Sequence, residues 1–310
     1  MPNALFSQLF ILLAIAAVGY LCRRTGLYPE ETQQQTSTII LNIALPAGIV
    51  AASRMEMRTE DLIRLAQVAG FSAAYYTVGF YLIYRFFHAL PRFSQDERLV
   101  MTISLTFPNI AFMGFPLITA LLGQEALFYA AIMTLFFNTA LFTAGEKLFR
   151  GTTTSLRTVL LRPANIATAV MLLLFGFQIR LPQVLHDALS MLGSLSTPLS
   201  MLIVGALIAE SPLSILIRDW RCWLLSLLRL LVVPLLLFGI LLLLRFDPFV
   251  IWLCSILSTM PSAAMSAILA ERYNRDPQLA SAAVVHSMLL FIPAIYLIME
   301  LLQRFVPYAF

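Results

Sequence analysis

A proline and asparagine pair stands inside an apolar stretch that is long enough to cross a lipid bilayer. The stretch "TFPNIAFMGFPLI" (106–118) contains Pro108, Asn109, Gly114 and Pro116. Proline removes a backbone donor and disturbs the preceding helical turn, and hydrocarbon offers no water to unpaired backbone groups. Non-helical backbone at membrane depth is tolerated where it is buried in protein or lines a polar cavity. An asparagine amide in such a place can donate hydrogen bonds to a carboxylate without burying a full positive charge.

A second stretch later in the chain has the same character. "STMPSAAMSAILAERYN" (258–274) places Pro261 among small residues, with Ser262 directly after it, and small residues let backbones approach closely. Taken alone, each stretch is read as an ordinary proline kink. Interrupted helices at matching positions of two halves, however, indicate the binding site of a secondary transporter. The matched pair therefore favours two crossing, broken helices.

The composition is that of a membrane protein. Of 310 residues, 60% are hydrophobic and 12% are charged, and the mean hydropathy is +0.87. A soluble domain carries about 25% charged residues, so the lipid bilayer is the expected surroundings. The net charge of +4 comes from scattered basic residues and does not indicate nucleic-acid binding.

Motifs for nucleotide, metal or nucleophilic chemistry are absent from the sequence. It contains no Walker A pattern, no glycine-rich dinucleotide fingerprint, no His-Glu-x-x-His and no nucleophile elbow. Its three cysteines (Cys22, Cys222 and Cys254) match no metal or disulfide spacing. We therefore expect neither an enzyme nor an ATP-driven pump, and no cofactor or metal site.

Ten apolar segments approach the length of about 20 residues that spans a bilayer. They cover residues 3–22, 36–53, 62–87, 98–122, 125–147, 163–179, 190–209, 219–244, 248–271 and 278–303. The first lacks a basic region before it, so it is expected to remain as a span rather than to be removed as a signal peptide. The sequence thus predicts an all-α, multi-pass protein of the plasma (inner) membrane.

Lysine and arginine residues predict the orientation, because they gather on the inner side of the membrane. With the N-terminus outside, thirteen basic residues fall on inner segments and six on outer ones. The inner set is Arg23, Arg24, Arg85, Arg92, Arg98, Lys147, Arg150, Arg157, Arg162, Arg218, Arg221, Arg272 and Arg275. The outer set is Arg54, Arg58, Arg64, Arg180, Arg245 and Arg304. Both termini are therefore expected outside.

Matching residues predict that the chain is duplicated. Pro46 and Pro198 are 152 residues apart, and Pro108 and Pro261 are 153 apart. Two further pairs, Glu146 with Glu300 and Arg150 with Arg304, are each separated by 154 residues. Because each half holds five segments, an odd number, the second half must be inverted in the membrane. The predicted domains are therefore five-helix repeats at 1–152 and 153–310, with the fourth and ninth helices broken.

The sequence resembles the auxin efflux carrier family, which includes the plant PIN proteins and shorter prokaryotic relatives. Four stretches carry the resemblance: "SLTFPNIAFMGFPLITALLGQEALFYA", "LNIALPAGI", "STPLSMLIVGALIA" and "MPSAAMSAILAERYNRDPQLASAAVVHSMLL". The resemblance extends over essentially the whole chain. The chain lacks the long hydrophilic central loop of many plant members, so it is similar to the prokaryotic type, and auxin is not expected to be its substrate.

This resemblance implies a fold and a mechanism. Segments 1, 2, 6 and 7 would form a scaffold that also makes a homodimer, and segments 3–5 and 8–10 would form a transport domain whose broken helices cross at the prolines. The implied activity is secondary transport of small organic anions (carboxylates), by efflux or exchange and with an elevator-type movement.

The resemblance also implies substrate contacts, each with a structural alternative. Asn109 would contact the substrate beside Pro108, Pro261 and Ser262, or would cap the second half-helix. Asn165, in "LRPANIATA", would reach the substrate or cap its own helix. Asn138 would line the site or join two helices. Leu45 would form an apolar wall, although on its own it is expected to serve packing.

Two residues are candidates for ion or proton coupling. Arg229 lies within the eighth segment, and charges inside a membrane are functional candidates by default; a side chain that snorkels outward or forms a structural pair is the favoured alternative. His286 has a suitable ordinary pKa for a proton relay, but helix–helix hydrogen bonding is the more common role of such a residue.

Two other classes of function stay open at this point. A sodium-coupled carrier of the related bile-acid type would show Na⁺-dependent uptake, although its usual acidic ion ligands are sparse here. A channel would show flux that does not saturate. A membrane assembly factor would show no flux and would bind a partner protein.

Overall fold

The computed structural model describes residues 2–53, 58–152, 155–210 and 219–307, and these residues are helical throughout apart from short connections. Each of the ten predicted segments is occupied by helix over most of its described length. Two residues of the charge count, Arg54 and Arg218, lie outside the described residues. So do residues 153 and 154, which directly follow the predicted repeat boundary at 152.

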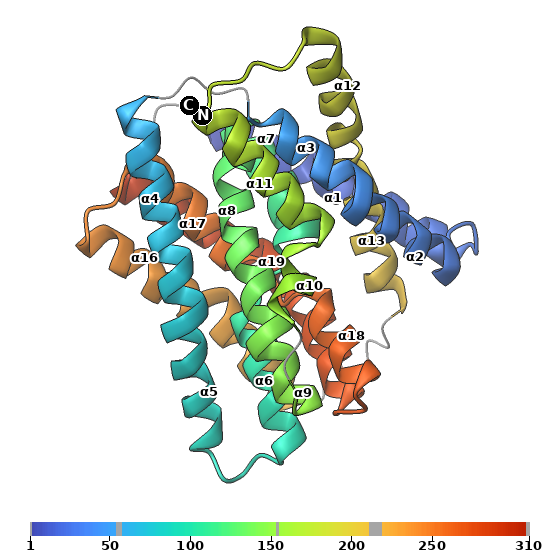
Figure 1. The fold of residues 1–310 in the computed structure, drawn as a ribbon. Helices are drawn as coiled ribbons and strands as arrows, with labels where there is room; N and C mark the ends of the chain where they lie inside the picture. Colours follow the sequence, from blue (N-terminus) through green and yellow to red (C-terminus); the bar gives the residue numbers. More distant parts are fainter. Residues whose placement is uncertain (1, 54–57, 153–154, 211–218, 308–310) are drawn as a thin grey trace. The chain divides into compact units, whose positions relative to one another are not determined.

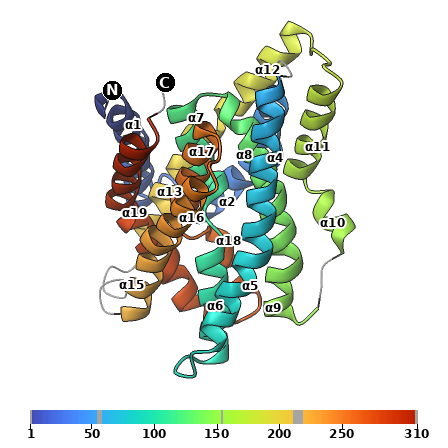
Figure 2. The ribbon, with the colours of Figure 1, turned by 90° about the vertical axis from the view of Figure 1, so that its left-hand side faces the viewer.

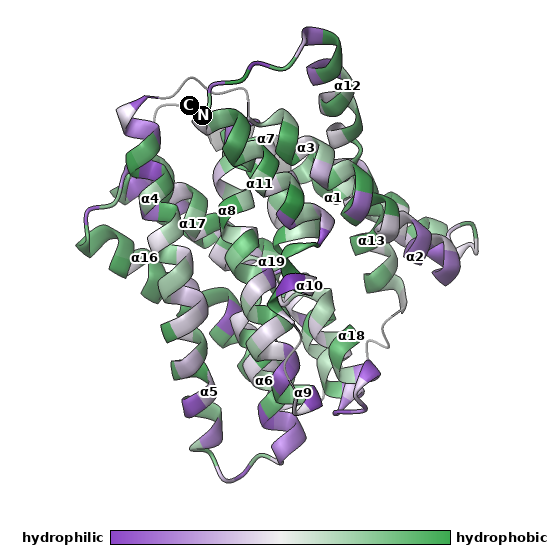
Figure 3. Ribbon diagram, in the orientation of Figure 1, coloured by the Kyte–Doolittle hydropathy of each residue, from purple (hydrophilic) through white to green (hydrophobic). Residues whose placement is uncertain are grey.

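Four helical stretches in the described part of the chain are long and apolar enough to cross a membrane: Glu125–Arg150, Gln183–Ala209, Trp220–Leu243 and Pro277–Phe305. Three shorter apolar stretches cover Ile110–Leu122, Pro163–Gly176 and Pro248–Thr259. Large apolar side chains such as Val184 and Leu243 are 82% exposed, as expected where lipid replaces water. In Figure 3, polar residues concentrate on α2 and at the start of α6, whereas α11 and α16 are mostly hydrophobic.

The chain forms two compact units. Their helices are labelled in Figure 1. Unit 1 comprises Met1–Leu65, Ala111–Leu135 and Leu160–Glu210. Its helices are α1 (Pro2–Arg24), α2 (Glu30–Ile39), α3 (Leu45–Ala51), α7 (Phe115–Leu122), α11 (Pro163–Gly176), α12 (Gln183–Ser194) and α13 (Ser196–Glu210). α1 packs along α13, and α3 packs against both α11 and α12.

Unit 2 comprises Ala66–Ile110, Phe136–Val159 and Ser211–Phe310. Its helices are α5 (Phe80–His88), α6 (Gln95–Thr106), α9 (Glu146–Arg150), α15 (Trp220–Leu227), α16 (Val233–Leu243), α17 (Pro248–Thr259), α18 (Ala264–Arg272) and α19 (Pro277–Phe305). α19 contacts α15, α17 and α18, and the contact of α15 with α19 is visible in Figure 2. Four described helical elements lie across the unit boundaries in the chain: α4 (Thr59–Ala74), η3 (Ile110–Gly114), α8 (Glu125–Ala140) and α10 (Leu156–Leu160).

Short π-helical segments interrupt several helices. They are η1 (Ile40–Ala44), η2 (Tyr75–Gly79), η3 (Ile110–Gly114), η4 (Leu141–Gly145) and η5 (Leu228–Val232). Three of them end two residues before a proline, namely Pro46, Pro116 and Pro234. A proline clashes with the carbonyl four residues earlier, and the wider π turn moves that carbonyl away. The helix can therefore continue through the proline with local widening.

A charged cluster fixes the start of α6 in unit 2. Ser94 and Glu97 form a capping box, in which the Ser94 N–H donates to Glu97 Oε2 over 2.6 Å. The guanidinium of Arg221 donates to Glu97 and to both oxygens of Asp219. Arg275 and Asp96 pair over 2.9 Å in the same unit. These pairs hold α6 and the start of α15 together at the end of the unit.

Acid is expected to weaken this cluster. Burial alone would raise the pKa of Glu97, but hydrogen bonds from Ser94 and Arg221 hold that pKa below its ordinary value of 4.5. A carboxylate with a lowered folded-state pKa stabilises the fold above its unfolded pKa, and this contribution disappears as the pH falls through the folded value. The melting temperature should therefore fall as the pH drops below 4.5 through the lowered pKa of Glu97. Glu97→Gln should lose less stability in acid than wild type, with Asp219 supplying the remaining acid-dependent loss, and superimposable pH profiles of the two proteins would contradict the assignment.

Candidate functional site

The two predicted breaks are present in unit 2, and they meet. α6 ends at Thr106 and α17 ends at Thr259, and Pro108 pairs with Ser262 in an isolated antiparallel bridge. The Asn109 N–H donates to the Pro261 carbonyl over 2.7 Å, and the Ala263 N–H donates to the Phe107 carbonyl over 2.9 Å. Two hydrogen bonds thus join the interrupted helices, and we call residues 107–109 and 260–263 the crossover.

This pairing explains why the prolines are tolerated at depth. The two hydrogen bonds of the bridge are made by the residues on either side of Pro108 and Ser262. Pro108, which has no N–H, therefore needs to donate none. The Ser262 N–H is satisfied by the Ser287 hydroxyl at 3.1 Å, and the Ser262 hydroxyl donates to the Ser104 carbonyl at 2.9 Å. The non-helical backbone of the crossover is therefore hydrogen-bonded within the protein, as hydrocarbon surroundings require.

Arg229 joins the ends of both broken helices. This residue lies in η5, is fully buried, and extends its guanidinium among backbone carbonyls. Its Nη1 donates to the Leu105 carbonyl over 2.7 Å, its Nε to the Met260 carbonyl over 3.0 Å, and its Nη2 to the Ser258 carbonyl. The snorkelling alternative is therefore wrong, because the charge points into the protein. Whether the side chain also takes part in coupling stays a prediction.

Tyr75 extends this arrangement. Its hydroxyl donates to the Thr106 carbonyl over 2.8 Å and accepts from Arg229 Nη1 over 3.1 Å. Together with Arg229 and Ser262, it binds three consecutive carbonyls at the C-terminal end of α6. These are groups that a helix end leaves without intrahelical partners. The sequence offered Arg229 as a lone charge in an apolar run, but nothing in the sequence connects it to residues 124 positions away.

The predicted asparagines take different places. Asn109 is 3% exposed at the crossover, where its backbone N–H is bonded. Asn138 is half-buried in α8, and its neighbour Phe137 packs edge-on against Phe107 of the crossover with ring centroids 5.3 Å apart. This part of α8 therefore lies beside the crossover in unit 2.

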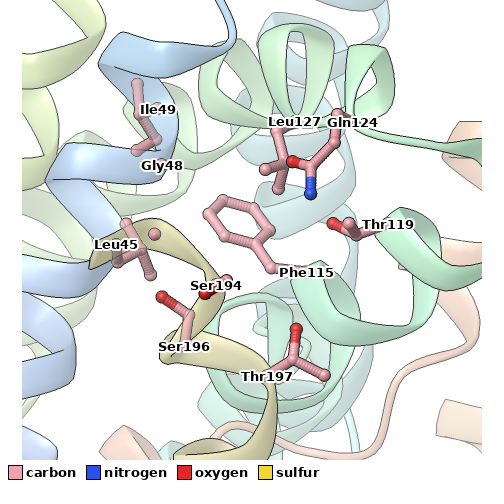
Figure 4. A pocket seen from close by; sticks show the side chains of 11 residues that line it. Leu45, Gly48, Ile49, Phe115, Thr119, Gln124, Leu127, Ser194, Ser196 and Thr197 are labelled. Carbon is pink, nitrogen blue, oxygen red and sulfur yellow. The ribbon is translucent and has the colours of Figure 1, made fainter. Parts of the chain in front are cut away.

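Asn165 and Leu45 belong to unit 1. Asn165 is buried in the first turn of α11, whose N-cap residue is Arg162, so the alternative that Asn165 caps this helix is wrong. Leu45 begins α3 and lines a small pocket within unit 1 (Figure 4). The ring of Phe115 lies in the middle of the pocket residues in that view. The other pocket residues are Gly48, Ile49, Thr119, Gln124, Leu127, Gly193, Ser194, Ser196 and Thr197.

His286 joins two helices of unit 2. Its Nδ1 lies 2.7 Å from the Ser226 hydroxyl, and its ring packs edge-on against Trp223 with centroids 4.6 Å apart. Ser226 and Trp223 are on α15 and His286 is on α19, so the helix–helix hydrogen bond expected as the structural alternative is present. A role in proton relay stays a prediction.

Comparison with known proteins supports transport. A family model described as membrane transport protein matches residues 4–158 and 150–299 of the chain. The chain is also similar to a protein of Methanocaldococcus jannaschii named as an uncharacterized transporter, with 24% identity over 286 residues, which are 88% of this chain and 91% of the relative. With its apolar helices and the two matched breaks, the chain belongs to the membrane transport protein family and is a multi-pass membrane transporter rather than an enzyme.

Proposed function

We propose that the protein is a secondary transporter of small organic anions that carry a carboxylate. The observation that supports this most directly is the crossover, where two interrupted helices meet through the Pro108 and Ser262 bridge. Interrupted helices at corresponding positions of two halves form the substrate sites of many secondary transporters. The resemblance to auxin efflux carriers supports the same class of substrate.

The electrostatics of the crossover favour an anion. α18 begins at Ala264, directly after the crossover, and its N-cap Ala263 contributes no side-chain cap. A helix start carries partial positive charge and unpaired N–H groups, which together attract carboxylates. The opposite, negative ends of α6 and α17 are already bound by Arg229. Asn109 adds a neutral amide, and we propose that it donates to the substrate.

The remaining site residues and the mechanism are part of the same proposal. As the resemblance implies, Asn165 reaches the substrate, Asn138 lines the site and Leu45 forms an apolar wall. The ten segments form two inverted five-helix repeats, 1–152 and 153–310, in the plasma membrane with both termini outside. Segments 3–5 and 8–10 move against the other four in an elevator-type cycle, and the scaffold segments form a homodimer.

Counterflow in proteoliposomes tests this function. Vesicles are preloaded with one of several mono- or dicarboxylates, and labelled external acid is followed for wild type and for Asn109→Ala. We expect saturable exchange that falls by about tenfold or more in the variant, because it loses hydrogen bonds to a charged group worth about 1.5–3 kcal/mol.

A matched asparagine provides the control. Asn42 is exposed and donates to the Thr38 carbonyl on its own helix at 2.9 Å, so Asn42→Ala should exchange like wild type. Equal loss in both variants would remove Asn109 from the site. The absence of exchange with every acid tested would remove organic-anion transport as the function, and flux without saturation would indicate a channel.

A further inference from the structure

At the crossover of unit 2, the buried positive charge of Arg229 meets the C-terminal ends of two helices. A helix C-terminus carries about half a negative charge, and the C-terminal ends of α6 and α17 meet at one place. Two such ends amount to about one negative charge. The guanidinium of Arg229, with one positive charge, lies among their carbonyl oxygens. The helix ends and the side chain therefore compensate each other.

The partners of Arg229 are all neutral groups. Its guanidinium donates to three carbonyl oxygens and to the hydroxyl of Tyr75, and the side chain is fully buried. A buried arginine normally requires a carboxylate, because removing its charge from water is costly. Here the helix dipoles take the place of that carboxylate.

Converging carbonyl oxygens are also what an alkali-metal ion requires. Half-helix C-terminal ends and unwound carbonyls coordinate Na⁺ in secondary transporters, and rings of carbonyls replace the hydration shell of ions in channels. At this crossover, the oxygens of Leu105, Ser258 and Met260 are occupied by a side chain of the chain itself.

We infer that Arg229 is a built-in cation. Its guanidinium fills the place that an alkali-metal ion would take, and the protein therefore transports without an alkali-metal ion bound at this place. Removal of the guanidinium creates a carbonyl-lined site that accepts a monovalent cation. The statement about transport rests on the proposed function, whereas the statement about the cation site does not.

Thermal stability in detergent tests the cation site without any substrate. Wild type and Arg229→Ala are melted in NaCl, KCl, LiCl and choline chloride at equal ionic strength. We expect the melting temperature of wild type to be the same in all four salts. Arg229→Ala should melt lower than wild type in choline, and a small alkali cation should raise its melting temperature saturably, by about 5 °C at a concentration well above its dissociation constant.

Two variants at the same position serve as controls. Arg229→Met fills most of the space with an apolar chain, so it should be destabilised in every salt and should respond to none. Arg229→Lys retains the charge on a single donor group, so it should be more stable than Arg229→Ala in choline and should not respond to Na⁺. If Arg229→Ala does not fold in choline, purification in the presence of methylguanidinium or NaCl should recover it.

The outcomes separate the two proposals. A melting temperature of Arg229→Ala that is independent of the cation, with no recovery by any of them, would overturn the cation site. A wild-type melting temperature or exchange rate that depends on Na⁺ would overturn the built-in cation. If wild type exchanges no organic anion but the melting temperature of Arg229→Ala depends on the cation, the proposed function is overturned and the cation site stands.

Discussion

Replacing Gly205 with alanine is expected to force α1 away from α13 and to destabilise unit 1 severely. A Cβ at position 205 would lie 1.8 Å from the carbonyl oxygen of Ala16 and 2.7 Å from the backbone nitrogen of Tyr20. The reverse contact is also too close for a side chain, since a Cβ at Gly19 would lie 2.2 Å from the carbonyl oxygen of Leu202. These neighbours are backbone atoms on regular helices, so they cannot rotate away. The two helices touch backbone to backbone, and a single methyl group is enough to separate them.

The size of the effect follows from this geometry. Overpacking a well-packed interior costs about 1–3 kcal/mol when side chains can adjust. Here whole helices must shift, so we expect Gly205→Ala to lose about 3 kcal/mol or more. The loss should appear as a lower melting temperature of the purified protein in detergent, or as a failure to fold.

The same substitution elsewhere in the chain is the control. Gly239 lies in α16, and a Cβ built there meets no atom within 4 Å. Alanine is a better helix former than glycine by about 1 kcal/mol, so Gly239→Ala should be neutral or slightly stabilising. Identical melting curves for Gly205→Ala and Gly239→Ala would show that α1 and α13 are not in this close contact.

Features that depend on single residues were predictable from the sequence. Proline removes a backbone donor and disturbs the preceding turn, so breaks near Pro108 and Pro261 could be predicted from the sequence, although at Pro116 the helix continues. The apolar segments could be located because spanning a bilayer sets a length and excludes charge. The pairing of the two breaks was inferred only from their equal positions in two halves, and in the structure they are joined by hydrogen bonds.

Features that depend on contacts between distant residues were not predictable. Arg229 is 154 residues from Tyr75 and 124 from Leu105, and no basic residue stands next to either break in the sequence. The pocket beside Leu45 combines three separate stretches of unit 1, and each of them is unremarkable by itself. Capping was the structural alternative for Asn165, but Pro163 is the first residue of α11 and leaves Arg162 as the cap.

The second large effect is expected from placing a proline at position 263. The Ala263 N–H makes one of the two hydrogen bonds of the crossover, to the Phe107 carbonyl over 2.9 Å. The backbone at Ala263 has φ −64° and ψ 135°, which suits proline, and Ser262 before it is in an extended pairing. Ala263→Pro therefore removes one donor with little change of backbone shape. Because Phe107 is fully buried, its carbonyl loses its partner at a cost of about 1–3 kcal/mol.

A proline at the neighbouring position 264 is the control, because it introduces the same ring without removing the hydrogen bond to Phe107. Ala264 is the first residue of α18, where the N–H has no partner within the helix and proline is favoured. Ala264→Pro should therefore melt like wild type, while Ala263→Pro should melt lower and lose exchange in the counterflow assay. If both variants melt alike, the hydrogen bond between the two breaks is not what holds the crossover together. If only Ala263→Pro melts lower, two chain segments 154 residues apart in sequence hold each other at the crossover through this hydrogen bond, and the matched prolines leave backbone groups unused by the helices for that pairing.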